Sequence, residues 1–139
     1  MEAETYVDIN AFIYWLGGHP SFGRRAYEWV KRIEEAPRGK YATSSLTVYE
    51  ALVIIAGLAK RSLGDARFVG GVVNSIANLR GLSIEPLRAE YLSRALGLME
   101  EYGLDYEDSI HLATALGAGA REIISNDGDF DKTPLKRKF

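Results

Sequence analysis

The stretch Thr5-Tyr6-Val7-Asp8-Ile9-Asn10 places an acid within a short run of apolar and β-branched residues. Such a run predicts a buried strand over residues 5–9. Asn10 is a favourable helix N-cap, so we expect a short helix that runs from Asn10 to the Gly17-Gly18 pair. A carboxylate at the end of a buried strand is unusual, because a buried charge needs partners. Asp8 is therefore the first candidate functional residue, and its alternative role is to cap that helix.

The rest of the chain continues this alternation of short strands and amphipathic helices. Further strands are expected over residues 41–43, 82–85, 122–125 and 135–139. Three further helices are expected to start at the caps Ser21, Ser44 or Ser45, and Asp65. Two more are expected over residues 88–102 and 105–117. Strands that alternate with helices pair in parallel through right-handed crossovers. The prediction is an α/β fold with a central parallel sheet of four to five strands.

Length and composition limit the classes of protein that this chain can represent. A chain of 139 residues fits a single domain over 1–139. The absence of cysteine excludes disulfides, thiolate-bound metals and thiol catalysis. The formal net charge of −2 does not favour a strongly basic nucleic-acid clamp. No apolar run approaches the ~20 residues of a membrane span, and the acidic N-terminus is not a secretory signal, so we expect a cytoplasmic protein without membrane contact.

Four carboxylates fall where a parallel sheet places its ligand site, at the carboxyl ends of the strands. Asp8 follows the first strand and Asp127 follows the fourth, whereas Glu50 and Asp108 lie on helices that can reach the same edge. Carboxylates gathered in one pocket repel one another, and a divalent cation such as Mg²⁺ or Mn²⁺ relieves that repulsion. Such ions support in-line displacement at a phosphodiester. The residue types therefore indicate metal-dependent phosphoryl chemistry.

Each of these residues also has a structural alternative. Glu50 can belong to a partly exposed helix face, and Asp108 stands three residues after Asp105, as in a capping box. Asp127 and Asp129 flank Gly128 and can simply form a turn. His111 lies one helical turn after Asp108, so it either contacts substrate phosphate or is a packed residue with one satisfied nitrogen, the commoner role.

The sequence resembles the PIN-domain ribonucleases, and among them the VapC-type toxin nucleases, over essentially its whole length. The resemblance is carried by Val7-Asp8-Ile9-Asn10, by Thr47-Val48-Tyr49-Glu50, by the helix Asp108-Ser109-Ile110-His111-Leu112-Ala113-Thr114-Ala115-Leu116, and by Ile123-Ile124-Ser125-Asn126-Asp127-Gly128-Asp129-Phe130. It implies a three-layer α/β/α sandwich around the parallel sheet.

The resemblance also implies a site and partners. Catalytic and metal-binding roles fall on Asp8, Glu50, Asp108 and Asp127. Asn10 and Ser125 are implied as polar supports, and Asp129 as an additional outer acid. The implied cofactor is Mg²⁺ or Mn²⁺, the implied substrate is RNA, and the implied partners are a second copy of the chain and a small antitoxin protein.

The leading hypothesis is therefore a divalent-metal-dependent endoribonuclease that acts as the toxin of a toxin–antitoxin pair. One alternative is a non-catalytic RNA- or protein-binding module that keeps the same fold. Another is an RNA-processing nuclease outside any toxin–antitoxin system. Binding of divalent metal separates the non-catalytic module from the other two, because a scaffold has no need of an ion. A dinucleotide-binding fold is excluded, since the turn after the first strand lacks glycine.

Overall fold

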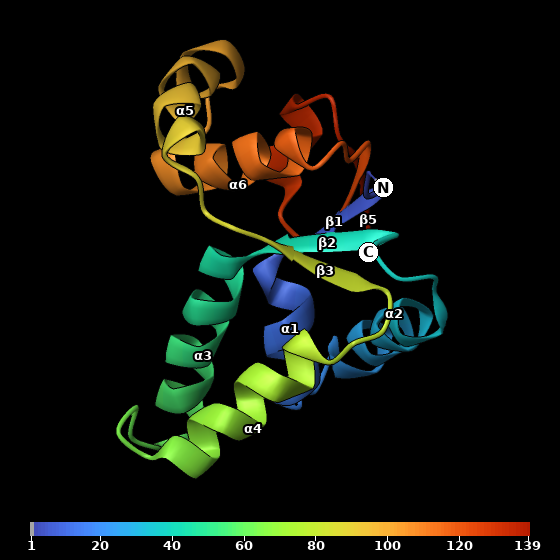
Figure 1. The fold of residues 1–139 in the computed structure, drawn as a ribbon, viewed down its shortest axis with the longest axis vertical. Helices are drawn as coiled ribbons and strands as arrows, with labels where there is room; N and C mark the ends of the chain where they lie inside the picture. The colour runs from blue at the N-terminus through green and yellow to red at the C-terminus, as the bar shows by residue number, and fades with distance from the viewer. Residues whose placement is uncertain (1) are drawn as a thin grey trace.

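A five-stranded parallel sheet forms the centre of the computed structural model, which describes residues 2–139 (Figure 1). Its strands are β1 (Thr5–Val7), β2 (Tyr41–Ser44), β3 (Leu82–Glu85), β4 (Glu122–Ile124) and β5 (Lys136–Lys138). Their order across the sheet is β3-β2-β1-β4-β5, and every neighbouring pair is parallel. The predicted parallel α/β sheet is confirmed.

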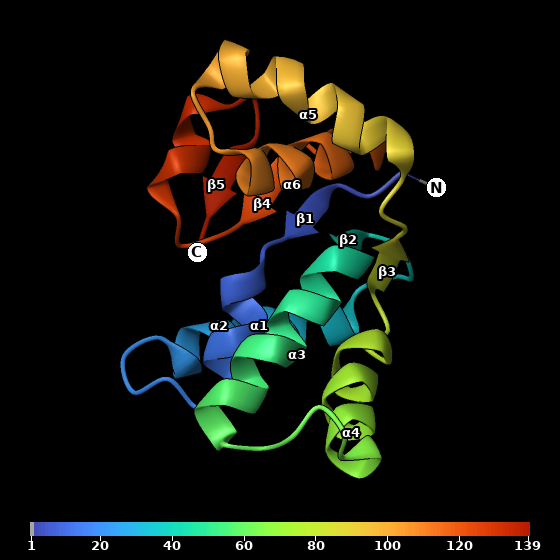
Figure 2. The same ribbon diagram turned by 90° about the vertical axis from the view of Figure 1, so that its left-hand side faces the viewer.

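Helices cover both faces of this sheet (Figures 1 and 2). One layer holds α1 (Ile9–Leu16), α2 (Gly23–Glu35), α3 (Ser45–Ala59) and α4 (Ala66–Ala77). The other holds α5 (Ala89–Tyr102), α6 (Tyr106–Gly117) and the short 3₁₀ helix η1 (Gly128–Lys132). The three-layer sandwich predicted from the sequence is confirmed. Within residues 2–139, no helix is both long enough and apolar enough to span a bilayer.

Two hydrophobic cores lie on opposite sides of the sheet, because successive side chains of a strand point to opposite faces. Val7 and Ile124 pack with Phe12 in the core beneath α1 to α4. Their strand neighbours Tyr6 and Ile123 pack in the second core with α5, α6 and η1. All five side chains are fully buried, so the sheet is fixed between the two helix layers.

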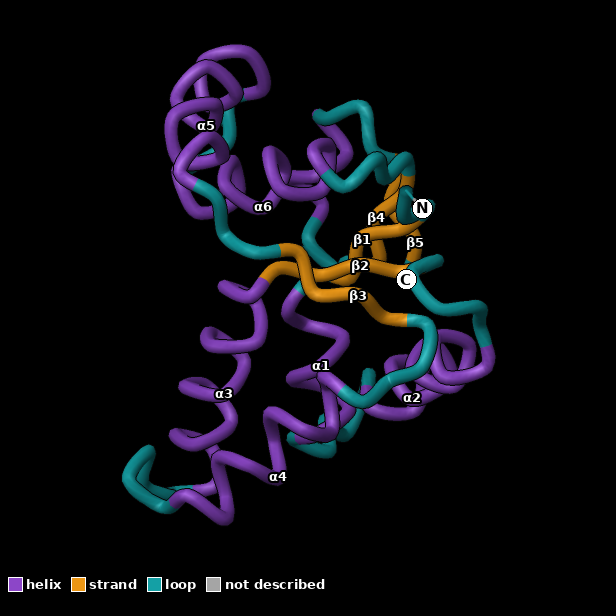
Figure 3. Tube along the Cα trace, viewed as in Figure 1, coloured by secondary structure: helices purple, strands orange, loops and turns teal. Residues whose placement is uncertain are grey.

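The carboxyl ends of the strands share one edge of the sheet, where the chain passes directly into helices (Figure 3). Asp8 alone separates β1 from α1, and β2 continues into α3, whose N-cap Ser44 accepts a hydrogen bond from the Leu46 N–H. The residues after β4 enter η1 at this edge as well. The polar residues that follow β1, β2 and β4 are thereby gathered on one side of the sheet.

Two predicted helix starts were wrong. β1 ends at Val7, and Asp8 stands at the N-cap position of α1 with extended backbone but without a side-chain capping hydrogen bond, so Asn10 lies inside the helix instead of capping it. The predicted cap at Ser21 is also absent, because α2 begins at Gly23 with Phe22 at the N-cap. The ring nitrogen Nδ1 of His19 accepts the N–H groups of Ser21 and Phe22, each at 3.0 Å, and these bonds hold the turn that leads into α2.

The predicted starts of two other helices and one predicted end are confirmed. Asp65 caps α4 through the Phe68 N–H, and Asp105 caps α6 through the Asp108 N–H at 2.8 Å. α5 ends at Gly103, whose φ of +69° belongs to the left-handed region that glycine enters without strain.

Candidate active site

Ser125 connects the carboxylate at the end of β1 to the acidic turn after β4. The Ser125 hydroxyl donates to Oδ2 of Asp8 at 2.6 Å. The hydroxyl oxygen Oγ of Ser125 also accepts a hydrogen bond from the backbone N–H of Asp127 at 3.0 Å. Asp8 is only 5% exposed, so its carboxylate depends on this neighbour for orientation. A single hydroxyl therefore fixes the position of Asp8 relative to Asp127.

Three aspartates from α6 and η1 form what we call the acidic cluster: Asp108, Asp127 and Asp129. One carboxylate oxygen from each lies within 4.8 Å of the other two. Asp127 sits at the N-cap of η1 and accepts the Asp129 N–H at 2.9 Å, so it is also a turn former. The bond that caps α6 uses the Asp105 side chain and only the backbone of Asp108. The Asp108 carboxylate is thus available to the cluster.

Electrostatic strain marks this region. Burial, together with the negative charges of Asp105, Asp127 and Asp8, raises the pKa of Asp108 to about 7. Burial also raises the pKa of Asp8, although the Ser125 hydrogen bond and the positive charge of His111 act in the opposite direction. Carboxylates that resist ionisation in this way gain stability from a nearby cation. The cluster is therefore a favourable place for a divalent ion.

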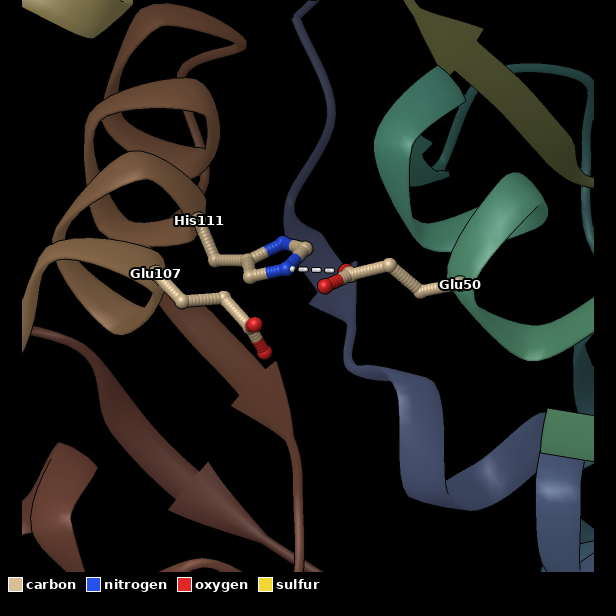
Figure 4. Close-up of side chains that lie close together, drawn as sticks. All are labelled: Glu50, Glu107 and His111. Atoms are coloured by element: carbon tan, nitrogen blue, oxygen red, sulfur yellow. Dashed lines mark hydrogen bonds and ion pairs between the residues drawn. The ribbon is translucent and has the colours of Figure 1, made fainter. Parts of the chain in front are cut away.

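A second group lies across the interface between α6 and α3 (Figure 4). Glu107 and His111 extend from α6 toward Glu50 on α3, and one ligand atom from each lies within 4.8 Å of the others. His111 Nε2 is 2.9 Å from Oε1 of Glu50. Burial raises the pKa of Glu107, and the charge and hydrogen bonding of Glu50 add to the rise. Glu50 is therefore held by α6, the helix that also carries Asp108.

His111 is almost fully buried, with 2% of its surface exposed, and both of its ring nitrogens have partners. Nδ1 lies 2.7 Å from the hydroxyl of Tyr6 on β1. In the neutral ring Tyr6 donates to Nδ1 and Nε2–H donates to Glu50, and in the charged ring Nε2 still donates to Glu50. Burial opposes the charged ring, but the Glu50 bond and the nearby carboxylates raise the pKa of His111 overall. The packed role expected from the sequence agrees with this burial, and the structure engages both ring nitrogens where one was expected.

The other residues expected from the sequence lie in these same contacts. Asn10 Oδ1 accepts the Asn126 N–H at 3.2 Å, which ties α1 to the turn that carries Asp127. Glu107 was not among the predicted site residues. Its spacing of four from His111 places the two on one helix face, and that spacing is the sequence signal that marks it.

The donor set suits a hard divalent cation. The acidic cluster offers carboxylate oxygens, which Mg²⁺ and Mn²⁺ prefer, and the sequence contains no cysteine to favour a softer metal. Two oxygens bound to one Mg²⁺ at about 2.1 Å are at most about 4.2 Å apart. Oxygens within 4.8 Å need only small side-chain adjustments to reach that separation.

The fold and the site together place this chain among α/β proteins that carry an oxygen-donor site at the carboxyl edge of a parallel sheet. The PIN domain model matches residues 5–136, and the chain belongs to the PIN domain family. The assignment of residues 1–139 to one domain remains our prediction. A search of curated proteins found no match.

Three solved structures share the fold over almost the whole chain. A toxin–antitoxin complex from Klebsiella pneumoniae has 22% identity and a TM-score of 0.67, covering 96% of this chain and 99% of that one. VapC20 of Mycobacterium tuberculosis, described as a sarcin–ricin-loop-cleaving toxin, has 14% identity and a TM-score of 0.69, covering 92% and 93%. VapBC2 of Rickettsia felis, solved on a DNA fragment from its promoter, has 19% identity and a TM-score of 0.64, covering 96% of each chain.

Proposed function

We propose that this protein is a divalent-metal-dependent endoribonuclease. The observation that carries the proposal is the acidic cluster beside buried Asp8, at the carboxyl edge of a PIN-domain sheet. The proposed catalytic and metal-binding residues are Asp8, Glu50, Asp108 and Asp127, with Asp129 as an outer acid. When bound, Mg²⁺ or Mn²⁺ would lower the pKa of a water molecule and stabilise the leaving oxygen during in-line attack on a phosphodiester.

The neighbouring residues keep these carboxylates in place. Ser125 orients Asp8 and, through the Asp127 N–H, the start of η1. His111 contacts Oε1 of Glu50 and thereby fixes the orientation of that carboxylate. Asn10 fixes the backbone of Asn126 next to Asp127. These contacts hold the acids before substrate arrives, and such preorganisation is what catalysis by charge stabilisation requires.

We further propose that the protein is the toxin of a toxin–antitoxin pair in the cytoplasm. The support is structural: a protein described as a toxin and a complex described as toxin–antitoxin share its fold along nearly the entire chain. The proposal includes a small antitoxin partner and a homodimer. Ile54 and Leu58, one turn apart on α3, are 43% and 64% exposed, and they offer contiguous apolar surface that a partner would cover.

Calorimetric titration of Mn²⁺ into the wild type, Asp8→Asn and Glu100→Gln tests the nuclease proposal, with a parallel cleavage assay on a mixed RNA pool. Glu100 is an exposed acid on α5 and serves as the matched control. We expect binding and cleavage in the wild type and in Glu100→Gln, and loss of both in Asp8→Asn. No metal binding in the wild type would favour the non-catalytic module, because a scaffold has no need of an ion.

Induced expression in a bacterial host tests the toxin role. Growth should stop with the wild type and continue with Asp8→Asn. RNA cleavage in vitro without growth arrest would point instead to an RNA-processing nuclease. Light scattering at working concentration tests the homodimer, and a monomer mass would remove it from the proposal.

A further inference from the structure

Four aromatic rings pack together beside the acidic turn, and we call them the aromatic cluster: Tyr14, His19, Phe22 and Phe139. The Tyr14 ring centroid lies 4.8 Å from that of His19, 5.2 Å from that of Phe22 and 5.7 Å from that of Phe139. His19 stacks on Phe22 at 5.1 Å. The rings come from α1, from the α1–α2 connection and from the residue after β5.

The aromatic cluster is joined to the proposed active site. The Tyr14 hydroxyl accepts a hydrogen bond from Nδ2 of Asn126 at 3.3 Å, and Asn126 immediately precedes Asp127. Along α1, Tyr14 stands six residues after Asp8, which corresponds to about 9 Å of helix axis. That distance is short enough for neighbouring nucleotides of one RNA strand to lie at both places.

These rings are held in place but not covered. His19 accepts the N–H groups of Ser21 and Phe22, and these two bonds fix the connection that presents the rings. All four rings are partly exposed, whereas the core rings of Phe12 and Phe130 are fully buried. The aromatic cluster is therefore a preformed aromatic surface that water still reaches.

A cation lies next to this surface. The guanidinium of Arg25 is 5.4 Å from the centroid of the Phe139 ring. Within residues 2–139, neither Arg25 nor its neighbour Arg24 forms an ion pair with an acid. Their charge complements the phosphate backbone of a nucleic acid, and aromatic rings beside such cations are the usual components of a single-strand binding surface.

We propose that the aromatic cluster is a base-binding subsite for single-stranded RNA, next to the phosphate that the acidic cluster would receive. An unpaired base stacks on the exposed rings, Arg25 contacts its phosphate, and the side-chain amide of Asn126 lies within reach of the base edge. The bases of a duplex are already stacked on each other, so this subsite selects unpaired segments. The proposal deepens the nuclease function proposed above and rests on it.

The test measures binding without cleavage. Fluorescence anisotropy of a labelled uridine octamer is recorded in EDTA, where no divalent cation supports hydrolysis, with the wild type, Tyr14→Leu and Phe22→Leu. Loss of one stacked base predicts a Kd about 5- to 150-fold weaker in each variant. Tyr14→Phe keeps the ring and loses only the hydrogen bond from Asn126, so it should bind more tightly than Tyr14→Leu. Tyr27→Leu is the matched control, because Tyr27 is 51% exposed on α2 and lies outside the aromatic cluster.

An abasic ribose–phosphate octamer separates stacking from backbone contact. Its affinity should be lower than that of the uridine octamer and the same for the wild type and both leucine variants. Equal uridine affinity in all proteins, or an equal loss with the abasic octamer, would overturn the proposal. Photo-crosslinking of a 4-thiouridine octamer to the wild type needs no variant to fold. Crosslinks within residues 14–22, at Asn126 or at Phe139 support the subsite, and crosslinks confined elsewhere reject it.

These experiments distinguish failure of the subsite proposal from failure of the nuclease proposal. Base-dependent binding in EDTA that accompanies absent cleavage in Mn²⁺ would retain the subsite and reject the nuclease. Cleavage in Mn²⁺ with unchanged affinity in Tyr14→Leu and Phe22→Leu would retain the nuclease and reject the subsite.

Discussion

Nε2 of His111 lies 2.9 Å from Oε1 of Glu50, so a buried ring on α6 holds a carboxylate on α3 (Figure 4). The other ring nitrogen contacts the Tyr6 hydroxyl on β1 at 2.7 Å. One imidazole thus joins the two helix layers and the central strand of the sheet. Because α6 also carries Asp108, the position of Glu50 is coupled to that of the acidic cluster.

Replacement of His111 by leucine should lower the free energy of unfolding by about 1–3 kcal/mol, because the buried Tyr6 hydroxyl then loses its shortest hydrogen bond. Urea denaturation of the protein in EDTA measures this change. Arg94→Ala on the exposed side of α5 is the control and should stay within about 0.5 kcal/mol of the wild type. Equal stability of His111→Leu and wild type would show that the network contributes nothing to folding.

Asp8→Asn separates function from stability. Burial raises the pKa of Asp8, so the charged carboxylate is a cost to the folded state that the neutral amide removes. We expect unchanged or higher thermal stability at pH 8, together with RNA cleavage reduced by at least about 100-fold, since even residues that only support a metal ligand cost about 10–100-fold. Paired melting curves and cleavage rates check this. Cleavage at the wild-type rate would remove Asp8 from the catalytic residues.

The parallel sheet could be predicted from the sequence because its strands are short β-branched runs separated by helices with recognisable caps. The range 82–85 corresponds to β3, and the caps at Ser44 and Asp65 lie where the pattern places them. The start of α1 was placed too late, since cap preference favours Asn10 as much as Asp8. The strand geometry at Val7 decides between them, and that geometry depends on pairing with β2 and β4.

Part of the candidate site could also be predicted from the sequence. Asp8 and Asp127 follow strands, so the topology rule finds them, and Ser125 was singled out by the family resemblance. The connection of Glu50 to His111 depends instead on how α3 and α6 approach each other across the sheet, and sequence spacing does not contain that distance. The spacing of four from His111 places Glu107 on the same helix face, but its approach to Glu50 exists only in the folded chain.

Two glycine-to-alanine changes should have opposite effects on stability. A Cβ on Gly81 would overlap the backbone oxygen of Ile33 and would lie 2.8 Å from Cβ of Ala36. A backbone oxygen cannot move aside without distorting the chain, so Gly81→Ala should lower the free energy of unfolding by about 1–3 kcal/mol. Gly97 stands inside α5 with open space around its Cβ position, so Gly97→Ala should raise the free energy of unfolding by about 0.5–1 kcal/mol. Chemical denaturation of both variants measures the pair, and equal effects would contradict the packing at Gly81.

The pKa of about 7 at Asp108 predicts how metal-free stability depends on pH. The folded protein holds a proton there that the unfolded chain releases near pH 4, so the folded state is favoured at low pH and loses stability as pH rises toward 7. The raised pKa values of Asp8 and Glu107 act in the same direction. The lowered pKa values of Asp65, Glu122 and Asp131 place their titration below this window. The melting temperature in EDTA should therefore decrease as the pH rises from 5 to 8. The decrease should be smaller in Asp108→Asn than in the wild type.

Mn²⁺ should reverse this dependence, because a cation binds the ionised carboxylates and releases their protons. Its affinity should rise with pH up to about pH 7 and then level off. Calorimetry in two buffers of different ionisation enthalpy should detect proton release at pH 6 and little at pH 8. Glu100→Gln should reproduce the wild-type profile, since that exposed acid is outside the cluster. An affinity independent of pH between 5 and 8 would mean that the acids of this edge do not bind the ion.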